Sequence, residues 1–177
     1  AVGWTRAHIA EYGGDPGSIF LMGHSAGAQI AALLATDASW LARIRMKPRD
    51  LAGFIGLAGP YYFTPITDPD QIGMFGSTPA QQRHSQPFDF VDGDEPPMLV
   101  MQGADDQSVN PKNATYLAYA LHVYHEPVEL HMYPHVDHGG IIRALSRSSS
   151  GHDPELGDIL AFIRAHSGGN SATATTP

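Results

Sequence analysis

One stretch of the sequence decides the fold, FLMGHSAGAQ at residues 20–29. It reads as an apolar strand, a Gly-x-Ser-x-Gly turn and the start of a helix rich in small residues. This order predicts a nucleophile elbow, in which Ser25 stands on a sharp, strained strand-to-helix turn and its hydroxyl points off the end of the sheet. We expect Gly23 and Gly27 there because a β-carbon at either position would collide with the backbone around the turn.

The residue after the serine, Ala26, would offer its backbone N–H to a developing oxyanion from the first position of the helix. A Gly-x-Ser-x-Gly pattern also occurs by chance in loops rich in glycine and serine. Here the strand before the motif and the helix after it supply the context that the motif needs. We therefore predict that Ser25 is a catalytic nucleophile, and that His24 flanks the elbow without being a catalyst.

The composition restricts the class of protein. The 177 residues suit one domain with a sizeable core, and 10 Lys+Arg against 18 Asp+Glu give a net charge of −8, which argues against a nucleic-acid partner. No apolar run approaches the roughly 20 residues of a membrane-spanning helix. Cysteine is absent, which excludes disulfides and thiolate zinc sites. The compartment stays open, with a cytoplasmic location slightly favoured.

Short apolar segments alternate with helical segments along the chain. Strands are predicted at 19–22, 51–58, 97–103 and 128–133, with helices between and after them. This alternation predicts an α/β fold, a mostly parallel sheet flanked by helices. We expect one domain over residues 1–166 and a disordered tail, rich in Ser, Gly, Thr and Ala, over 167–177.

Residues 61–87 have no regular hydrophobic period and are rich in proline and aromatic residues. A segment of this length without a pattern is usually functional or mobile. We expect a loop or lid excursion over the active-site end of the sheet, with a plain surface connection as the alternative. Thr78 and Pro79 predict one short helix within it.

A serine hydroxyl needs a base within hydrogen-bonding reach and an acid that orients the base. In an elbow-type fold the acid and then the histidine follow the serine, each just after a strand. The segment GADDQSV at 103–109 follows the third predicted strand, and YPHVDHGG at 133–140 follows the fourth. The candidate acids are therefore Asp105 and Asp106, and the candidate bases are His135 and His138.

With these segments the chain resembles the α/β-hydrolase superfamily, and within it the esterase and formamidase-like branch related to hormone-sensitive lipase. The resemblance rests on GHSAGA at 23–28, GADDQSV at 103–109 and HG at 138–139, and it covers nearly the whole chain up to about residue 166. It implies Ser25 as nucleophile, Asp106 as orienting acid and His138 as base, with Asp105 and His135 as second choices. It implies no cofactor.

The histidines at 131, 135 and 138 have another interpretation, a metal site, because imidazoles at such spacings can converge on zinc. However, His131 lies on a predicted strand, and the serine-centred interpretation already accounts for His138. We therefore predict no metal.

The sequence departs from the family pattern in a segment that is often Tyr-Asp-Leu among the relatives. Tyr61, Tyr62 and Phe63 lie there, so we expect an aromatic pocket that favours apolar or aromatic acyl or alcohol groups.

A second departure concerns the strands before the elbow. The family places several strands and a His-Gly-Gly type oxyanion loop before the serine, which here is only residue 25. We expect residues 1–166 to be the C-terminal portion of an α/β-hydrolase domain that lacks the N-terminal strands. Either the chain is part of a longer hydrolase, or a partner segment or a homo-oligomer covers the open sheet edge. An oxyanion hole with only the Ala26 N–H would slow the reaction about 100- to 1,000-fold.

Together these features predict a serine hydrolase that cleaves short-chain carboxylic esters through an acyl-enzyme intermediate, impaired if the chain is this short. The alternatives are an amide or formamide hydrolase of the same fold, and a non-catalytic α/β-hydrolase-like module that only binds a ligand.

Overall fold

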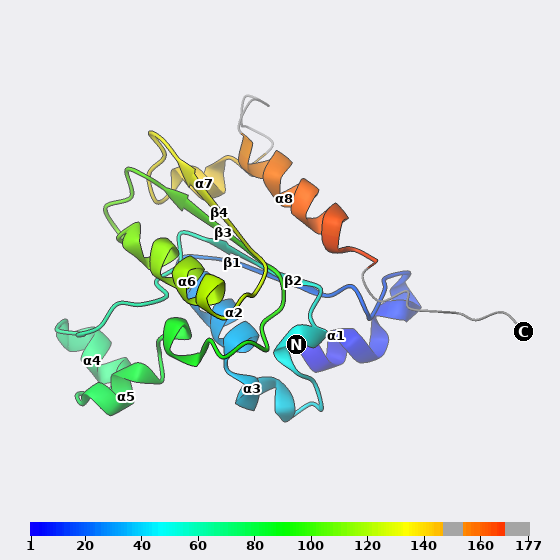
Figure 1. The fold of residues 1–177 in the computed structure, drawn as a ribbon, viewed down its shortest axis with the longest axis horizontal. Helices are drawn as coiled ribbons and strands as arrows, with labels where there is room; N and C mark the ends of the chain where they lie inside the picture. Colours follow the sequence, from blue (N-terminus) through cyan, green and yellow to red (C-terminus); the bar gives the residue numbers. More distant parts are fainter. Residues whose placement is uncertain (147–153, 169–177) are drawn as a thin grey trace, which may run out of the picture.

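The computed structural model describes residues 1–146 and 154–168. At its centre lies a four-stranded parallel sheet with the strands in sequence order (Figure 1). The strands are β1 (Phe20–His24), β2 (Gly53–Leu57), β3 (Met98–Gly103) and β4 (Val128–Tyr133). The α/β fold with a parallel sheet is therefore confirmed.

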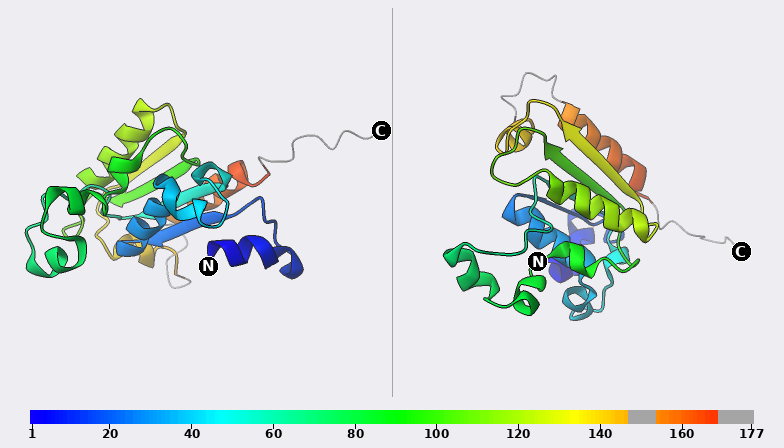
Figure 2. Two further views of the ribbon diagram at one scale, coloured as in Figure 1. Left: turned by 90° about the horizontal axis from the view of Figure 1, so that it is seen from below. Right: turned by 60° about the vertical axis from the view of Figure 1, so that its left-hand side comes forward.

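Helices cover both faces of the sheet (Figures 1 and 2). On one face lie α2 (Ala26–Thr36) and α6 (Lys112–Val123), and on the other lie α7 (Gly140–Arg143) and α8 (Pro154–His166). The shorter helices are α1 (Val2–His8), η1 (Ile9–Tyr12), α3 (Ala38–Ala42), η2 (Pro48–Asp50), α4 (Pro69–Phe75), α5 (Pro79–Arg83) and η3 (Pro87–Phe90). Within the described ranges, no helix is long and apolar enough to cross a bilayer.

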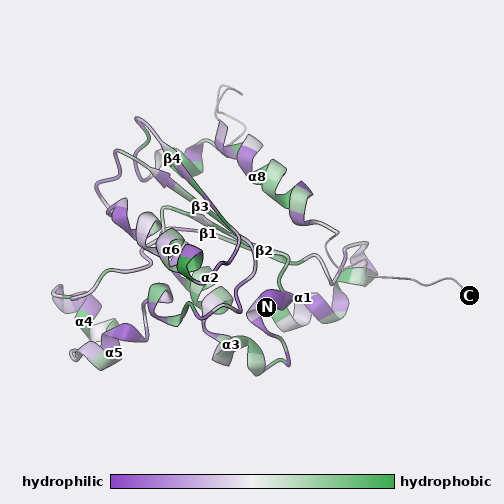
Figure 3. Cartoon of the chain, viewed as in Figure 1, coloured by the Kyte–Doolittle hydropathy of each residue, from purple (hydrophilic) through white to green (hydrophobic). Residues whose placement is uncertain are grey.

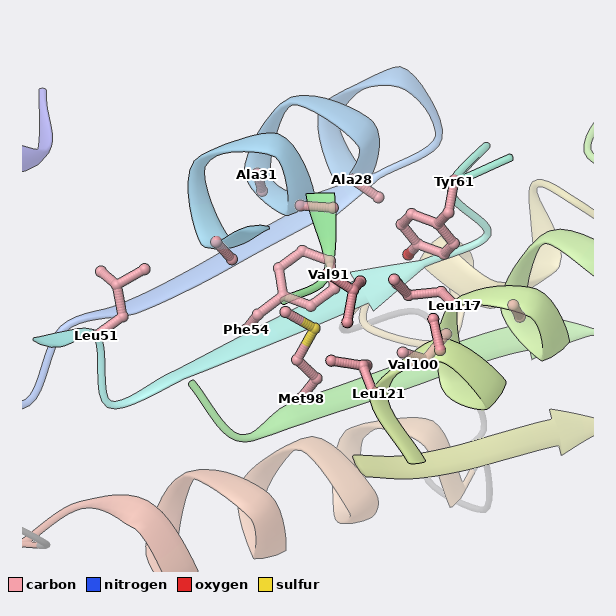
Figure 4. Packing of buried hydrophobic residues seen from close by; sticks show 14 of the residues in the cluster. Ala28, Ala31, Leu51, Phe54, Tyr61, Val91, Met98, Val100, Leu117 and Leu121 are labelled. Carbon is pink, nitrogen blue, oxygen red and sulfur yellow. The ribbon is translucent and has the colours of Figure 1, made fainter. Parts of the chain in front are cut away.

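The two central strands, β2 and β3, are buried along their whole length. Successive side chains of a strand point to opposite faces. Phe54 and Met98 therefore pack with α2 and α6 (Figure 4). Ile55 and Leu99 pack on the other face with α7 and α8. Parallel strands with both faces covered read as continuous apolar runs, which is why the sequence revealed them. Hydrophobic colour accordingly runs through the centre of the molecule in Figure 3.

The outer strands, β1 and β4, each pair on one side only within this sheet. Met22 of β1 is 53% exposed, and the nearby α1 buries none of its residues, with Trp4 58% exposed. The sequence predicted an open sheet edge of this kind. A partner segment or second copy on that edge stays a prediction.

Residues 61–87 leave the sheet after β2 and return before β3, forming the end of the molecule opposite α1 (Figure 2). The predicted short helix is present as α5, where Thr78 and Gln81 form a reciprocal capping box. Helix α4 was not predicted from the sequence, although it begins in the same way as α5. Asp68 accepts a hydrogen bond from the Gln71 N–H, and Pro69 takes the first helical position.

Two buried glutamines hold this excursion together. The carboxamide of Gln82 accepts from the N–H of Ile66 and donates to its carbonyl, at 3.0 and 3.1 Å. Gln86 accepts from the Phe63 N–H at 2.7 Å. Buried backbone groups of an irregular segment need such partners. A lid function for the excursion stays a prediction. The predicted tail, apart from residues 167 and 168, lies outside the described residues.

Candidate active site

The turn between β1 and α2 has the geometry that the elbow motif predicts. Ser25 adopts φ 56° and ψ −125°, a region that non-glycine residues rarely occupy. Its N–H donates to the carbonyl of Leu57 at 2.9 Å, and its own carbonyl accepts from the N–H groups of Ala28 and Gln29. These bonds to β2 and α2 hold the strained serine at the carboxyl end of the sheet. The N–H of Ala26 stands at the first position of α2, where a helix provides no carbonyl partner.

The two elbow glycines differ in their steric role. A β-carbon on Gly23 would lie 2.3 Å from the carbonyl oxygen of Gly27, so a side chain is excluded there. A β-carbon on Gly27 would meet no atom within 4 Å, because Gly27 is exposed and presents its carbonyl, not its α-hydrogens, to Gly23. The expected collision is therefore confirmed for Gly23 and wrong for Gly27.

The structure brings Ser25, His138 and Asp106 together in one hydrogen-bonded chain. They follow β1, β4 and β3, whose carboxyl ends meet at one edge of the sheet. The Nδ1–H of His138 donates to Oδ2 of Asp106 at 2.8 Å, because a carboxylate can only accept. This leaves Nε2 free to accept from the Ser25 hydroxyl, 3.0 Å away. Such an arrangement activates a serine hydroxyl.

The Asp106 carboxylate is fully buried and saturated with donors. The N–H groups of Ser108 and Val109 bond Oδ1 at 2.8 and 2.9 Å, and Nε2 of Gln102 bonds Oδ2 at 2.9 Å. Burial by itself raises the pKa of Asp106, but the hydrogen bonds from Val109, His138, Ser108 and Gln102 outweigh it, and the pKa lies below its ordinary value. The carboxylate is therefore charged at neutral pH and can orient the imidazole.

Gln102 is a site residue that the sequence analysis missed. It is fully buried near the end of β3, four positions before Asp106. Its signal was a single amide inside the otherwise apolar segment PMLVMQG at 97–103. A buried polar side chain needs a partner, and this partner is the carboxylate of the site.

The second-choice residues lie apart from the serine. Asp105 and His135 have side chains 60% and 94% exposed, and they pair with each other at 3.7 Å on the surface. The Asp105 N–H donates to the carbonyl of Val136, which fixes the direction in which this turn presents its two aspartates. Adjacent turn residues point to different sides, so only one of them reaches His138.

The histidines of the metal hypothesis have separate partners. His131 bonds Asp158 of α8 at 2.9 Å, His135 faces solvent, and His138 bonds Asp106. Across residues 1–146 and 154–168, no group of three or more His, Cys, Asp or Glu side chains could hold a metal ion.

A cavity of about 880 Å³ opens beside Ser25 and His138. The excursion after β2 supplies much of its wall, including Tyr62 and Phe63, and α6 supplies Asn113 and Tyr116. The aromatic rings contact one another: Tyr62 packs on Tyr116 with ring centroids 5.8 Å apart. The sequence analysis missed both α6 residues, because only the fold brings the start of this helix beside the elbow.

Tyr61 does not line this cavity, although it was expected to. Its side chain is fully buried in the core, edge-on to Phe54 with ring centroids 6.2 Å apart (Figure 4). Burial raises the pKa of its hydroxyl. The chain bends at Tyr61, and Tyr61 faces the core whereas Tyr62 faces the cavity.

Much of the chain matches a known protein family. The BD-FAE family model matches residues 1–121. The esterase LipQ of Mycobacterium tuberculosis is 29% identical over 137 residues, covering 68% of this chain and 32% of LipQ. The chain thus spans about a third of this relative's length.

Solved structures share the fold at low sequence identity. A truncated form of a carbohydrate esterase from gut microbiota superposes with a TM-score of 0.74 at 16% identity, covering 94% of this chain and 65% of that one. Thermogutta terrifontis esterase 2 superposes with a TM-score of 0.71 at 20% identity, covering 99% and 64%. The expected resemblance to esterase-like α/β-hydrolases is confirmed. The chain belongs to the BD-FAE family of these hydrolases.

Proposed function

We propose that this chain carries the catalytic machinery of a serine hydrolase that cleaves carboxylic esters through an acyl-enzyme. The observation that carries the proposal is the hydrogen-bonded chain from Ser25 through His138 to Asp106 at the mouth of a cavity. LipQ is named an esterase, and the solved neighbours named above are esterases, which favours ester hydrolysis.

Acylation follows from the protonation states that the contacts impose. The Ser25 Oγ attacks the ester carbonyl carbon while His138 Nε2 takes the hydroxyl proton. Asp106 stays ionised and stabilises the imidazolium through Nδ1–H. The tetrahedral oxyanion accepts a hydrogen bond from the Ala26 N–H. When it collapses, the C–O bond to the alcohol breaks and His138 returns the proton to the leaving oxygen.

Deacylation repeats these steps with water as the nucleophile. His138 Nε2 takes a proton from water, the resulting hydroxyl attacks the acyl carbon, and the bond to Ser25 Oγ breaks as the proton returns to the serine. The carboxylic acid then leaves. We expect the reaction to be slow where Ala26 is the only oxyanion donor, since losing one donor costs about 100- to 1,000-fold.

The walls of the cavity restrict the substrate class. Tyr62, Phe63 and Phe75 present aromatic surface near Ser25, and Phe63 and Phe75 pack edge to face with ring centroids 5.6 Å apart. Packed rings of this kind form a fixed wall, and we assign a small acyl group to the space beside them. We propose short-chain esters as the substrates, with acyl or alcohol groups that pack against this apolar wall.

The test is covalent labelling of Ser25. Intact mass is recorded before and after exposure to a fluorophosphonate, and hydrolysis of p-nitrophenyl acetate is followed in parallel. We expect one adduct in the wild type and in Ser39→Ala, an exposed serine on α3, and none in Ser25→Ala. The activity of Ser25→Ala should fall at least about 1,000-fold.

Two results would redirect the proposal. A wild-type chain that takes up no adduct would leave the non-catalytic binding module as the better description. An anilide with the same acetyl group separates the leaving groups: faster cleavage of the anilide than of the ester would favour the amide hydrolase.

A further inference from the structure

We propose that His24 is a positioning residue that holds the base His138 at reacting distance from Ser25. This inference rests on the proposed function, in which His138 takes the serine proton. His24 immediately precedes the nucleophile in the chain, but its side chain is directed to the loop that carries the base.

A long-range hydrogen bond makes this link. Nε2 of His24 lies 2.9 Å from the carbonyl oxygen of His138, 114 residues further along the chain. A carbonyl oxygen can only accept, so His24 carries its proton on Nε2 and donates it. The contact is partly buried, where a hydrogen bond is less weakened by competing water.

The loop that carries His138 is also tied to the acid side of the site. After β4 ends at Tyr133, the Tyr133 carbonyl accepts from the Ala104 N–H at 2.9 Å, and the Val136 carbonyl accepts from the Asp105 N–H at 3.1 Å. Both donors belong to the turn that bears Asp106. The His24 bond connects the same loop to the strand that bears the nucleophile, so it sets the spacing between β1 and the base.

The two imidazole rings also contact each other. Their centroids are 4.7 Å apart and their planes are tilted by 42°. His138 is bonded at both ring nitrogens, and the ring of His24 packs beside it. The hydrogen bond fixes the backbone of the base, and the ring contact limits rotation of its side chain.

Three variants separate these contributions. His24→Gln places an amide N–H near the position of Nε2 and removes the ring. His24→Phe keeps a ring of similar size and removes the donor. His8→Phe is the matched control, because His8 is a half-buried histidine on α1 that does not line the cavity.

The first measurement is the rate constant for fluorophosphonate labelling of Ser25, with thermal unfolding recorded on the same samples. We expect His24→Phe to react about tenfold more slowly, because a displaced base loses its alignment with the serine. His24→Gln should stay within about threefold of the wild type, and the control should be unchanged. Equal losses in the Gln and Phe variants, or no loss in Phe, would overturn the assignment of the hydrogen bond.

The second measurement does not depend on catalysis. In ¹⁵N-histidine-labelled protein, the His138 ring signals are assigned by their loss in His138→Gln. The His138 Nε2 shift should move in His24→Phe and return towards the wild-type value in His24→Gln, while the Nδ1–H signal bonded to Asp106 persists. If the wild type does not label at all, the proposed function fails, and unchanged His138 signals in His24→Phe would separately overturn this inference.

Discussion

Two of the histidine–aspartate pairs are hydrogen-bonded, and only one of these two lies beside a serine hydroxyl. His138 bonds Asp106 through Nδ1 at 2.8 Å, and His131 bonds Asp158 through Nδ1 at 2.9 Å. In both pairs burial raises the pKa of the aspartate, hydrogen bonds outweigh that effect, and the pKa lies below its ordinary value. The pairs are chemically alike.

The two pairs differ in the group that lies beside Nε2 of the histidine. Nε2 of His138 faces the Ser25 hydroxyl at the mouth of the cavity. In the other pair, the Tyr133 hydroxyl donates to Asp158 at 2.6 Å, and Nε2 of His131 lies 3.6 Å from Glu129. The second pair ties β4 to α8 and orients no nucleophile. A His–Asp pair therefore indicates a function only together with what its free ring nitrogen meets.

The largest expected difference in activity is between variants that remove the charge of Asp106 and of Asp158. Asp106→Asn should lower esterase activity and labelling by about 1,000- to 10,000-fold, because the amide can impose the wrong tautomer on His138. Asp158→Asn should leave both within about twofold. Steady-state hydrolysis of p-nitrophenyl acetate by the two variants checks this. Similar losses in both would show that the comparison is mistaken.

Replacing Gln102, the buried amide that donates to Asp106, should have a smaller effect on activity. Gln102→Leu removes one donor from Asp106 and leaves three, so activity should fall about tenfold while Ser25 remains labelled. Gln71→Leu is the companion variant, because this glutamine of α4 lines the cavity and is not one of the four donors to Asp106. A loss in kcat for Gln102→Leu alone would assign the effect to Asp106, whereas equal losses in the two variants would contradict that assignment.

The second pair should matter for stability instead. Asp158→Asn weakens the bonds from His131 and Tyr133, so the free energy of unfolding should drop by about 1–2 kcal/mol. Urea unfolding followed by circular dichroism measures it. Tyr133→Phe removes one of these bonds and should show a smaller drop, and a larger drop in Tyr133→Phe would mean that packing dominates.

The smallest expected effect is on the pH dependence of stability below neutral pH. The pKa values of Asp106 and Asp158 are lower in the folded chain, so the stability that each contributes is present above the unfolded carboxyl value of about 3.9 and is lost as pH falls through the folded value. Unfolding free energies between about pH 6 and pH 2 should fall less steeply in Asp158→Asn than in the wild type. Identical slopes would argue against a lowered pKa for Asp158.

Several features of the fold were accessible from local patterns. Continuous apolar runs marked the buried strands, and the capping residue Thr78 with Pro79 marked α5. Helix α4 was overlooked although Asp68 and Pro69 carry the same signal. The candidate acid and base came from the resemblance, since spacing alone left Asp105 and His135 open. Their catalytic roles stay predictions until Ser25 is labelled.

The sequence by itself determined the order of strands and helices, the elbow around Ser25 and the segments that could hold an acid and a base. These follow from hydrophobic period and turn chemistry, which act over a few residues. Only the tertiary structure decided that Tyr62 faces the cavity and Tyr61 the core. It also decided which distant groups meet, such as His24 with His138 and Gln102 with Asp106. Such contacts depend on how whole elements pack, and no local pattern specifies them.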